Sequence, residues 1–139
     1  MNQAIATLKE AQKKAFAIRP KVGGFPYLAE VLRQAGVTRN IWNLPSCQSL
    51  YLMSGGAAVV IQGAPLISGE AEVSAFDREA LIAALRKDQA GLGTFPEFLE
   101  ASWHAGVIRY EVDFAARTVV YCGYRGEEYL EEYPAVEVR

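Results

Sequence analysis

The sequence has few of the residues on which most metal and nucleophile sites depend. Its 139 residues include one histidine and two cysteines, Cys47 and Cys122, which do not have metal-ligand spacing. The sequence therefore predicts no metal and no cofactor, and it predicts a reduced, cytoplasmic setting for the two thiols. It has no apolar run of about 18 residues that could span a bilayer. The first residues are typical of an amphipathic helix and not of a signal peptide, so we expect no membrane association.

A strong net charge is also absent. The formal net charge is −2, and the basic patch is modest, so nucleic acid is not an expected partner. The charges are unevenly placed, since residues 1–40 carry a net +5 and residues 97–139 a net −5. This asymmetry can steer a protein partner or favour head-to-tail association. Two solvated faces are the alternative explanation.

The sequence does contain an internal repeat. FPYLAEVLRQAGV, which starts at Phe25, recurs at Phe95 as FPEFLEASWHAGV. Such self-similarity indicates a duplication, and the length indicates one domain, residues 1–139. We expect repeats over about 3–62 and 76–133 and a connector over 63–75. At an offset of 70 residues, ten of the 44 positions from Gly23 to Leu66 are identical: Gly23/Gly93, Phe25/Phe95, Pro26/Pro96, Glu30/Glu100, Ala35/Ala105, Gly36/Gly106, Val37/Val107, Arg39/Arg109, Tyr51/Tyr121 and Gly56/Gly126.

Hydrophobic periodicity and capping residues predict the same elements in both repeats. In the first repeat we expect helices over about 3–17 and 26–35, then strands over 38–44, 48–53 and 57–61, the last being the most buried. In the second we expect helices over 77–90 and 95–105 and strands over 108–114, 118–122 and 128–133. Gly36 and Gly106 are placed to end helices in a left-handed conformation. The predicted class is α+β, with two pseudo-symmetric α-α-β-β-β repeats whose helices pack on an antiparallel sheet.

Three stretches carry a resemblance to a known family: GGFPYLAEVLRQAGV, SCQSLYL and AGVIRYEVDFAARTVVY. They resemble the YdfO/YbcV-like family of uncharacterised bacterial proteins, members of which are associated with enterobacterial prophages. The resemblance implies an α+β domain of about this length and a prophage-like origin. It supplies no catalytic residues.

The two repeats differ most at one strand and the turn after it. Ile108, Tyr110, Val112 and Phe114 are predicted to form a buried face, but their counterparts in the first repeat are Thr38, Asn40, Trp42 and Leu44. A polar turn follows, and polar and aromatic side chains together are typical of ligand sites. Alternatively, the polar residues cap the turn and Trp42 fills the core. The predicted ligand-binding residues are Trp42, Asn43, Ser46, Cys47, Gln48 and Tyr51.

Candidate catalytic residues are few. Cys47 is a possible nucleophile and His104, the only histidine, its possible base. Nothing in the sequence places them together, and a lone cysteine is more often a small buried apolar residue. No catalytic residue is therefore assigned.

The expected function is that of a non-enzymatic protein-binding module, with a separate protein or a second copy of the chain as partner. Tyr124, Tyr129 and Tyr133 are expected to expose rings of the kind found at interfaces. The alternative is a small enzyme or ligand-binding protein that uses the region from Trp42 to Tyr51. A self-associating structural unit is a third possibility.

Overall fold

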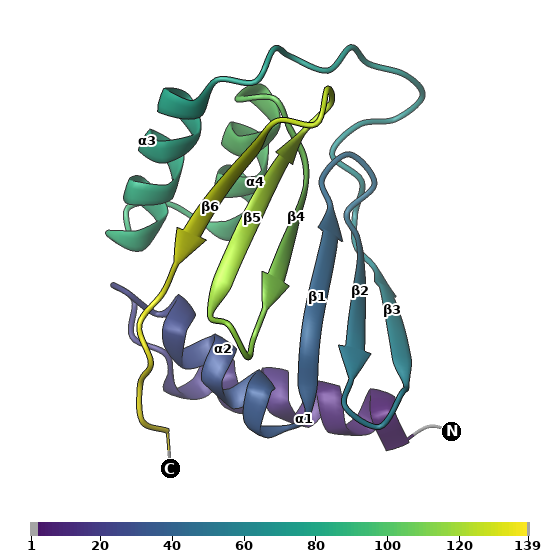
Figure 1. Ribbon diagram of the computed structural model, residues 1–139, viewed down its shortest axis with the longest axis vertical. Helices are drawn as coiled ribbons and strands as arrows, with labels where there is room; N and C mark the ends of the chain where they lie inside the picture. Colours follow the sequence, from purple (N-terminus) through teal and green to yellow (C-terminus); the bar gives the residue numbers. More distant parts are fainter. Residues whose placement is uncertain (1–2, 139) are drawn as a thin grey trace.

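The computed structural model describes residues 3–138, and it has the predicted α+β architecture with two repeats (Figure 1). The first repeat comprises α1 (Gln3–Ile18), α2 (Phe25–Gln34), β1 (Val37–Asn43), β2 (Gln48–Met53) and β3 (Ala58–Gln62). The second comprises α3 (Arg78–Gln89), α4 (Phe95–His104), β4 (Val107–Asp113), β5 (Thr118–Gly123) and β6 (Glu128–Glu132). From α2 onward, each element of the second repeat begins and ends 70 residues after its counterpart.

The six strands within residues 3–138 form one antiparallel sheet in the order β3-β2-β1-β4-β5-β6. The repeats meet where β1 pairs with β4, and the register there is reciprocal: Arg39 lies opposite Asp113, and Asn43 opposite Arg109. A pseudo-twofold axis therefore passes between Ile41 and its partner Glu111.

The third strand of each repeat forms an edge of the sheet (Figure 1). The prediction that residues 57–61 form the most buried strand is wrong. Val59 is buried, but Val60 is 59% exposed on the opposite face of β3. The unbroken apolar run was misleading because its outward side chains are apolar as well.

Local signals explain the helix boundaries. α1 buries Leu8, Ala11 and Ala15 on one face and ends before Pro20. The predicted left-handed residues after α2 and α4 are confirmed, since Gly36 and Gly106 have φ of +98° and +90°.

The second repeat has stronger caps than the first. The Asp77 side chain accepts a hydrogen bond from the Ala80 amide at the start of α3. Thr94 and Glu97 form a reciprocal capping box at the start of α4, whereas Gly24 precedes α2 without a side-chain cap.

Each central strand contains a β-bulge, in β1 between residues 37 and 39 and in β4 between residues 107 and 109. The bulge shifts the alternation of inward- and outward-facing side chains by one residue. Val37 and Val107 are therefore fully buried, whereas Thr38 is exposed and Ile108 half-buried. Assigning Thr38 and Ile108 to the buried face was wrong, because the extra residue of a bulge reverses the alternation. The expected burial of Tyr110, Val112 and Phe114 is confirmed.

The helices form two hairpins on the same face of the sheet. In Figure 1, α1 and α2 lie at its lower end, and α3 and α4 at its upper left. None of the helices within residues 3–138 combines the length and the apolar character that crossing a membrane requires. The candidate site lies between the two hairpins and the sheet.

Candidate functional site: a central cavity

A cavity of about 870 Å³ lies between the two helical hairpins and the sheet. Ligand sites are commonly about 300–1,000 Å³ and largely apolar, so this central cavity is large enough for a small molecule. A second hollow, between α3 and α4, is about 40 Å³ and has room for little more than a water molecule. Ten aromatic side chains line the central cavity: Phe16, Phe25, Trp42, Tyr51, Phe95, Phe98, Tyr110, Phe114, Tyr121 and Tyr133.

The floor of the cavity contains a row of aromatic cross-strand neighbours, Trp42, Tyr110 and Tyr121 on β1, β4 and β5. Tyr129 on β6 continues this row beyond the cavity lining. The rings of Trp42 and Tyr110 are nearly parallel, with centroids 6.1 Å apart. Tyr110 and Tyr121 are 5.7 Å apart, and Tyr121 and Tyr129 are 6.4 Å apart. Phe95 of α4 meets Trp42 edge-on at 5.2 Å. Each such pair contributes roughly 0.5–1.5 kcal/mol beyond its buried area.

The neighbouring row on the same face is mixed. Tyr51, Asn40, Val112 and Val119 lie side by side on β2, β1, β4 and β5. The pseudo-twofold axis exchanges the two rows, so Trp42 corresponds to Val112, and Tyr110 corresponds to Asn40. Both large rings fall in one row, and the cavity is therefore asymmetric although the backbone is symmetric.

Two loops that connect the helices border the cavity. The Gly23 amide donates a hydrogen bond of 3.0 Å to the Gln89 carbonyl and so joins the first loop to the end of α3. Gly91 has a φ of +71°, and a Cβ there would lie 2.9 Å from the Lys21 carbonyl oxygen. The close approach of the loops therefore requires glycine at position 91.

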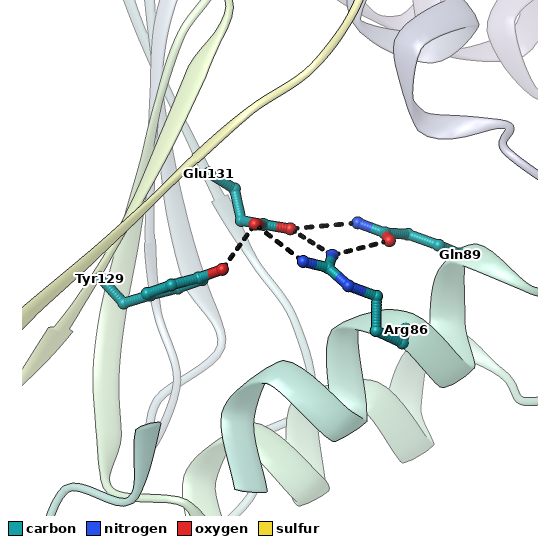
Figure 2. A network of polar contacts seen from close by, with 4 residues as sticks. All are labelled: Arg86, Gln89, Tyr129 and Glu131. Atoms are coloured by element: carbon teal, nitrogen blue, oxygen red, sulfur yellow. Dashed lines mark hydrogen bonds and ion pairs between the residues drawn. The ribbon is translucent and has the colours of Figure 1, made fainter. Parts of the chain in front are cut away.

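A polar network ties α3 to the last strand beside the cavity (Figure 2). The Glu131 carboxylate accepts hydrogen bonds from Arg86 Nη1 at 2.6 Å, from the Tyr129 hydroxyl at 2.6 Å and from Gln89 Nε2 at 3.3 Å. The bond from Arg86 is the main reason that the pKa of Glu131 is lowered. Because its ring packs in this corner, Tyr129 is buried, and the prediction that it is exposed was wrong; Tyr124 is exposed and Tyr133 half-buried.

Asp88, by contrast, has no such partners. It lines the cavity from the last turn of α3, and within residues 3–138 its carboxylate makes no hydrogen bond and no ion pair. Burial raises its pKa, and the charge of Arg19 lowers it to a smaller extent. The Arg19 guanidinium itself lies over the Phe16 ring, 4.6 Å from its centre.

The tyrosine hydroxyls in the cavity remain neutral. Burial raises the pKa of Tyr51, Tyr110 and Tyr121. The Tyr51 hydroxyl accepts a weak hydrogen bond of 3.4 Å from Gln12, while those of Tyr110 and Tyr121 have no partner in the described part of the chain. These hydroxyls are free to bind a guest.

Three of the six predicted ligand-binding residues, Trp42, Cys47 and Tyr51, line the cavity. The other three lie outside its lining. Asn43 pairs with Arg109 in the sheet, Ser46 is exposed in the turn, and Gln48 is exposed where β2 begins. The structure thus brings together the apolar half of the predicted set.

Cys47 and His104 are not brought together. The Cys47 thiol is buried and donates a hydrogen bond of 3.4 Å to the Leu44 carbonyl. Burial raises the pKa of this thiol, which disfavours the reactive thiolate. His104 is exposed at the end of α4, and no hydrogen bond joins it to Cys47 in the described residues. Residues 3–138 also contain no cluster of His, Cys, Asp or Glu that could hold a metal ion.

The sequence-based prediction missed the half of the cavity that the second repeat supplies: Tyr110, Tyr121, Phe95, Phe98 and Asp88. The alternation of β4 does identify Tyr110 as inward-facing. It does not reveal that β4 lies beside β1, and without that pairing Tyr110 is only another core residue.

Comparison with known proteins gives close relatives. No protein-family model matches the chain. It is 54% identical over 137 residues to Uncharacterized protein Rv2012 of Mycobacterium tuberculosis, an alignment that covers 99% of this chain and 83% of the relative. Uncharacterized protein Mb2035 of Mycobacterium bovis matches with the same identity and the same coverage. An identity this high over nearly the whole chain means that the protein belongs to the same family as these uncharacterised mycobacterial proteins.

Proposed function

We propose that this protein binds a small, largely apolar molecule in the central cavity and does not transform it chemically. One observation carries the proposal: a cavity of about 870 Å³ whose lining includes ten aromatic side chains. Empty space costs a folded protein dispersion contacts, so a hollow of this size is more readily explained by a guest than by stability.

The polar groups support binding over catalysis. The buried Cys47 thiol is held protonated, and the neutral hydroxyls of Tyr110 and Tyr121 are hydrogen-bond donors rather than bases. These groups can orient a guest but do not make up a nucleophile with its base.

A neutral fluorescent probe tests the proposal. We expect N-phenyl-1-naphthylamine to bind the full chain saturably, with one site per chain and a rise in its emission. Val112→Trp places a second indole at the position related to Trp42 by the pseudo-twofold axis and fills part of the cavity. We expect this variant to bind the probe at least tenfold more weakly.

Asn40→Tyr is a second filling variant, because it introduces the ring that the second repeat has at Tyr110. Circular dichroism and thermal unfolding show whether each variant is folded. If both folded variants bind the probe as tightly as the wild type, or if the wild type does not bind it, the cavity is not the binding site that we propose.

Protein binding, the first expectation from the sequence, is the second candidate function. It is favoured by the sheet face that the helices leave open. A row of paired residues crosses that face from edge to edge, and its only charged member is Glu111. Apolar rows on exposed sheets are typical of interfaces. The row consists of Val60, Leu50, Ile41, Glu111, Val120 and Leu130.

A second copy of the chain is the first partner to test. If the open face pairs two copies, light scattering will report a dimer, and Leu50→Lys will return it to a monomer. A wild-type chain that is monomeric at every concentration would exclude the homodimer. Cytoplasmic location and a prophage-like origin stay part of this proposal, and the resemblance to the YdfO/YbcV-like family stays a prediction, since the relatives are uncharacterised.

A further inference from the structure

Asp88 lies where a carboxylate is energetically disfavoured. The last turn of a helix has a negative dipole end, which repels an acid, and Asp88 is the penultimate residue of α3. The side chain is also half-buried and has no partner in residues 3–138. Residues that oppose their local energetics tend to lie at functional sites. The surroundings of Asp88 therefore indicate what it can bind.

The remaining charges in the cavity do not neutralise Asp88. Glu131 is already paired with Arg86. Arg19, whose charge acts on Asp88, stacks on Phe16 and makes no ion pair in the described part of the chain. The other charged side chains that line the cavity are both exposed: Lys21 and Glu132.

The aromatic lining favours a guest of positive charge. The face of an aromatic ring is the negative part of its quadrupole, so a cation within about 6 Å of a ring centre is attracted, most strongly by Trp and Tyr. The cavity presents Trp42, Tyr51, Tyr110 and Tyr121 together. Their hydroxyls stay neutral, so they bring no opposing charge.

We infer that the ligand of the central cavity is an organic cation with an aromatic or otherwise apolar body, bound with its charge beside Asp88. The inference rests on the proposed function, because it names the ligand class of the same cavity. The apolar body would make the dispersion contacts that the empty cavity lacks. The charge would supply the partner that Asp88 lacks.

Two ions of nearly the same shape and opposite charge provide the test. Tetraphenylphosphonium and tetraphenylborate each carry four phenyl rings and differ in the sign of the central charge. Their affinities for the full chain are measured by calorimetry at physiological salt, with N-phenyl-1-naphthylamine as the neutral reference. We expect the phosphonium to bind at least tenfold more tightly than the borate.

The matched variants are Asp88→Asn and Glu79→Gln. Both remove one acid from α3, but Glu79 is exposed in the first turn and does not line the cavity. We expect Asp88→Asn to weaken phosphonium binding about tenfold, the size of a partly desolvated cation contact, and to leave the neutral probe unaffected. Glu79→Gln should change neither affinity.

The outcomes separate the two proposals. If the neutral probe binds but the borate binds as tightly as the phosphonium, the ligand class is wrong and the proposed function stands. The same conclusion follows if Asp88→Asn binds the phosphonium like the wild type. If neither ion nor the neutral probe binds, both the ligand class and the proposed function are overturned.

Discussion

The two repeats share their backbone and differ in what they place on it. Every element from α2 to β3 recurs 70 residues later, and even the unusual left-handed residues Cys47 and Arg117 correspond, with φ of +53° and +56°. Yet the first repeat supplies Trp42 and Asn40 to the cavity floor where the second supplies Val112 and Tyr110.

The comparison shows how a duplicated fold can build one site. Two identical repeats would line the cavity with the same residues twice and would offer two equal half-sites. Here the exchange of large and small residues gathers the rings in one row, and Asp88 adds a charge from one side. Divergence of side chains on a conserved backbone is therefore enough to make the two halves of the cavity chemically different.

The largest expected difference between the repeats is in the stability that is lost when their helix-ending glycines are replaced. A Cβ on Gly106 would lie 2.7 Å from the Ala75 carbonyl oxygen and 2.7 Å from Phe76 Cα, whereas on Gly36 it meets only Ser54 Oγ at 3.2 Å. Both positions have positive φ, so alanine costs about 1–2 kcal/mol at either. Overpacking raises the loss at Gly106→Ala to about 3–5 kcal/mol. Urea unfolding of the two variants measures the difference, and equal losses would mean that the connector moves aside freely.

The buried valines that follow these glycines should behave alike. Val37 and Val107 are 2% and 0% exposed at equivalent positions. Val37→Ala and Val107→Ala should each lower the free energy of unfolding by about 2–3 kcal/mol, from lost burial and the remaining cavity. Denaturant unfolding at a common pH gives both values. A difference above about 1 kcal/mol would show that the two halves of the core are not packed equivalently.

The repeats should also differ in the stability that their helix caps contribute, and this difference is smaller. Thr94→Ala removes the capping box of α4 and should cost about 1 kcal/mol, while Thr94→Ser should retain most of the stability. The first repeat cannot acquire this cap, because a Cβ on Gly24 would lie 2.3 Å from the Pro20 carbonyl oxygen. Thermal unfolding of the two Thr94 variants is the measurement. An unchanged melting temperature in Thr94→Ala would mean that packing alone fixes the start of α4.

The smallest effect concerns one glutamate that both repeats retain. Glu30 is 8% exposed and bonded to Arg33 at 2.7 Å, and chiefly this bond lowers its pKa from 4.5 to about 2. Its counterpart Glu100 is exposed. Because Arg33 is partly exposed, Glu30→Gln should cost only about 0.5–1 kcal/mol at pH 7, and Glu100→Gln less.

The pH dependence gives the sign of this last effect. A carboxylate whose folded-state pKa is lowered stabilises the fold fully above its unfolded pKa and loses that contribution as the pH falls. The stabilities of the wild type and Glu30→Gln should therefore converge as the pH falls from 4.5 toward about 2. Parallel curves over this range would show that the ion pair does not stabilise the fold.

The sequence predicted features that depend on neighbouring residues and missed those that depend on strand pairing. Gly36, Gly106 and the Thr94 capping box act within a few residues, and all three have the predicted role. The bulge at Thr38 and the edge position of β3 depend on which strands lie side by side. The site divides in the same way, because Trp42, Cys47 and Tyr51 are close in sequence, while Tyr110 and Asp88 come from the other repeat.

The reciprocal pairing of β1 with β4 has a consequence for the origin of the protein. Arg39 faces Asp113, and the residue equivalent to Arg39, Arg109, faces Asn43, the residue equivalent to Asp113. This register is that of an isologous interface, in which two identical chains make the same contacts in both directions. An ancestral chain of a single repeat would thus have had the register to form the six-stranded sheet as a dimer. Gene fusion would have made that association intramolecular and raised its effective concentration, so that the two halves could acquire different mutations and still remain paired.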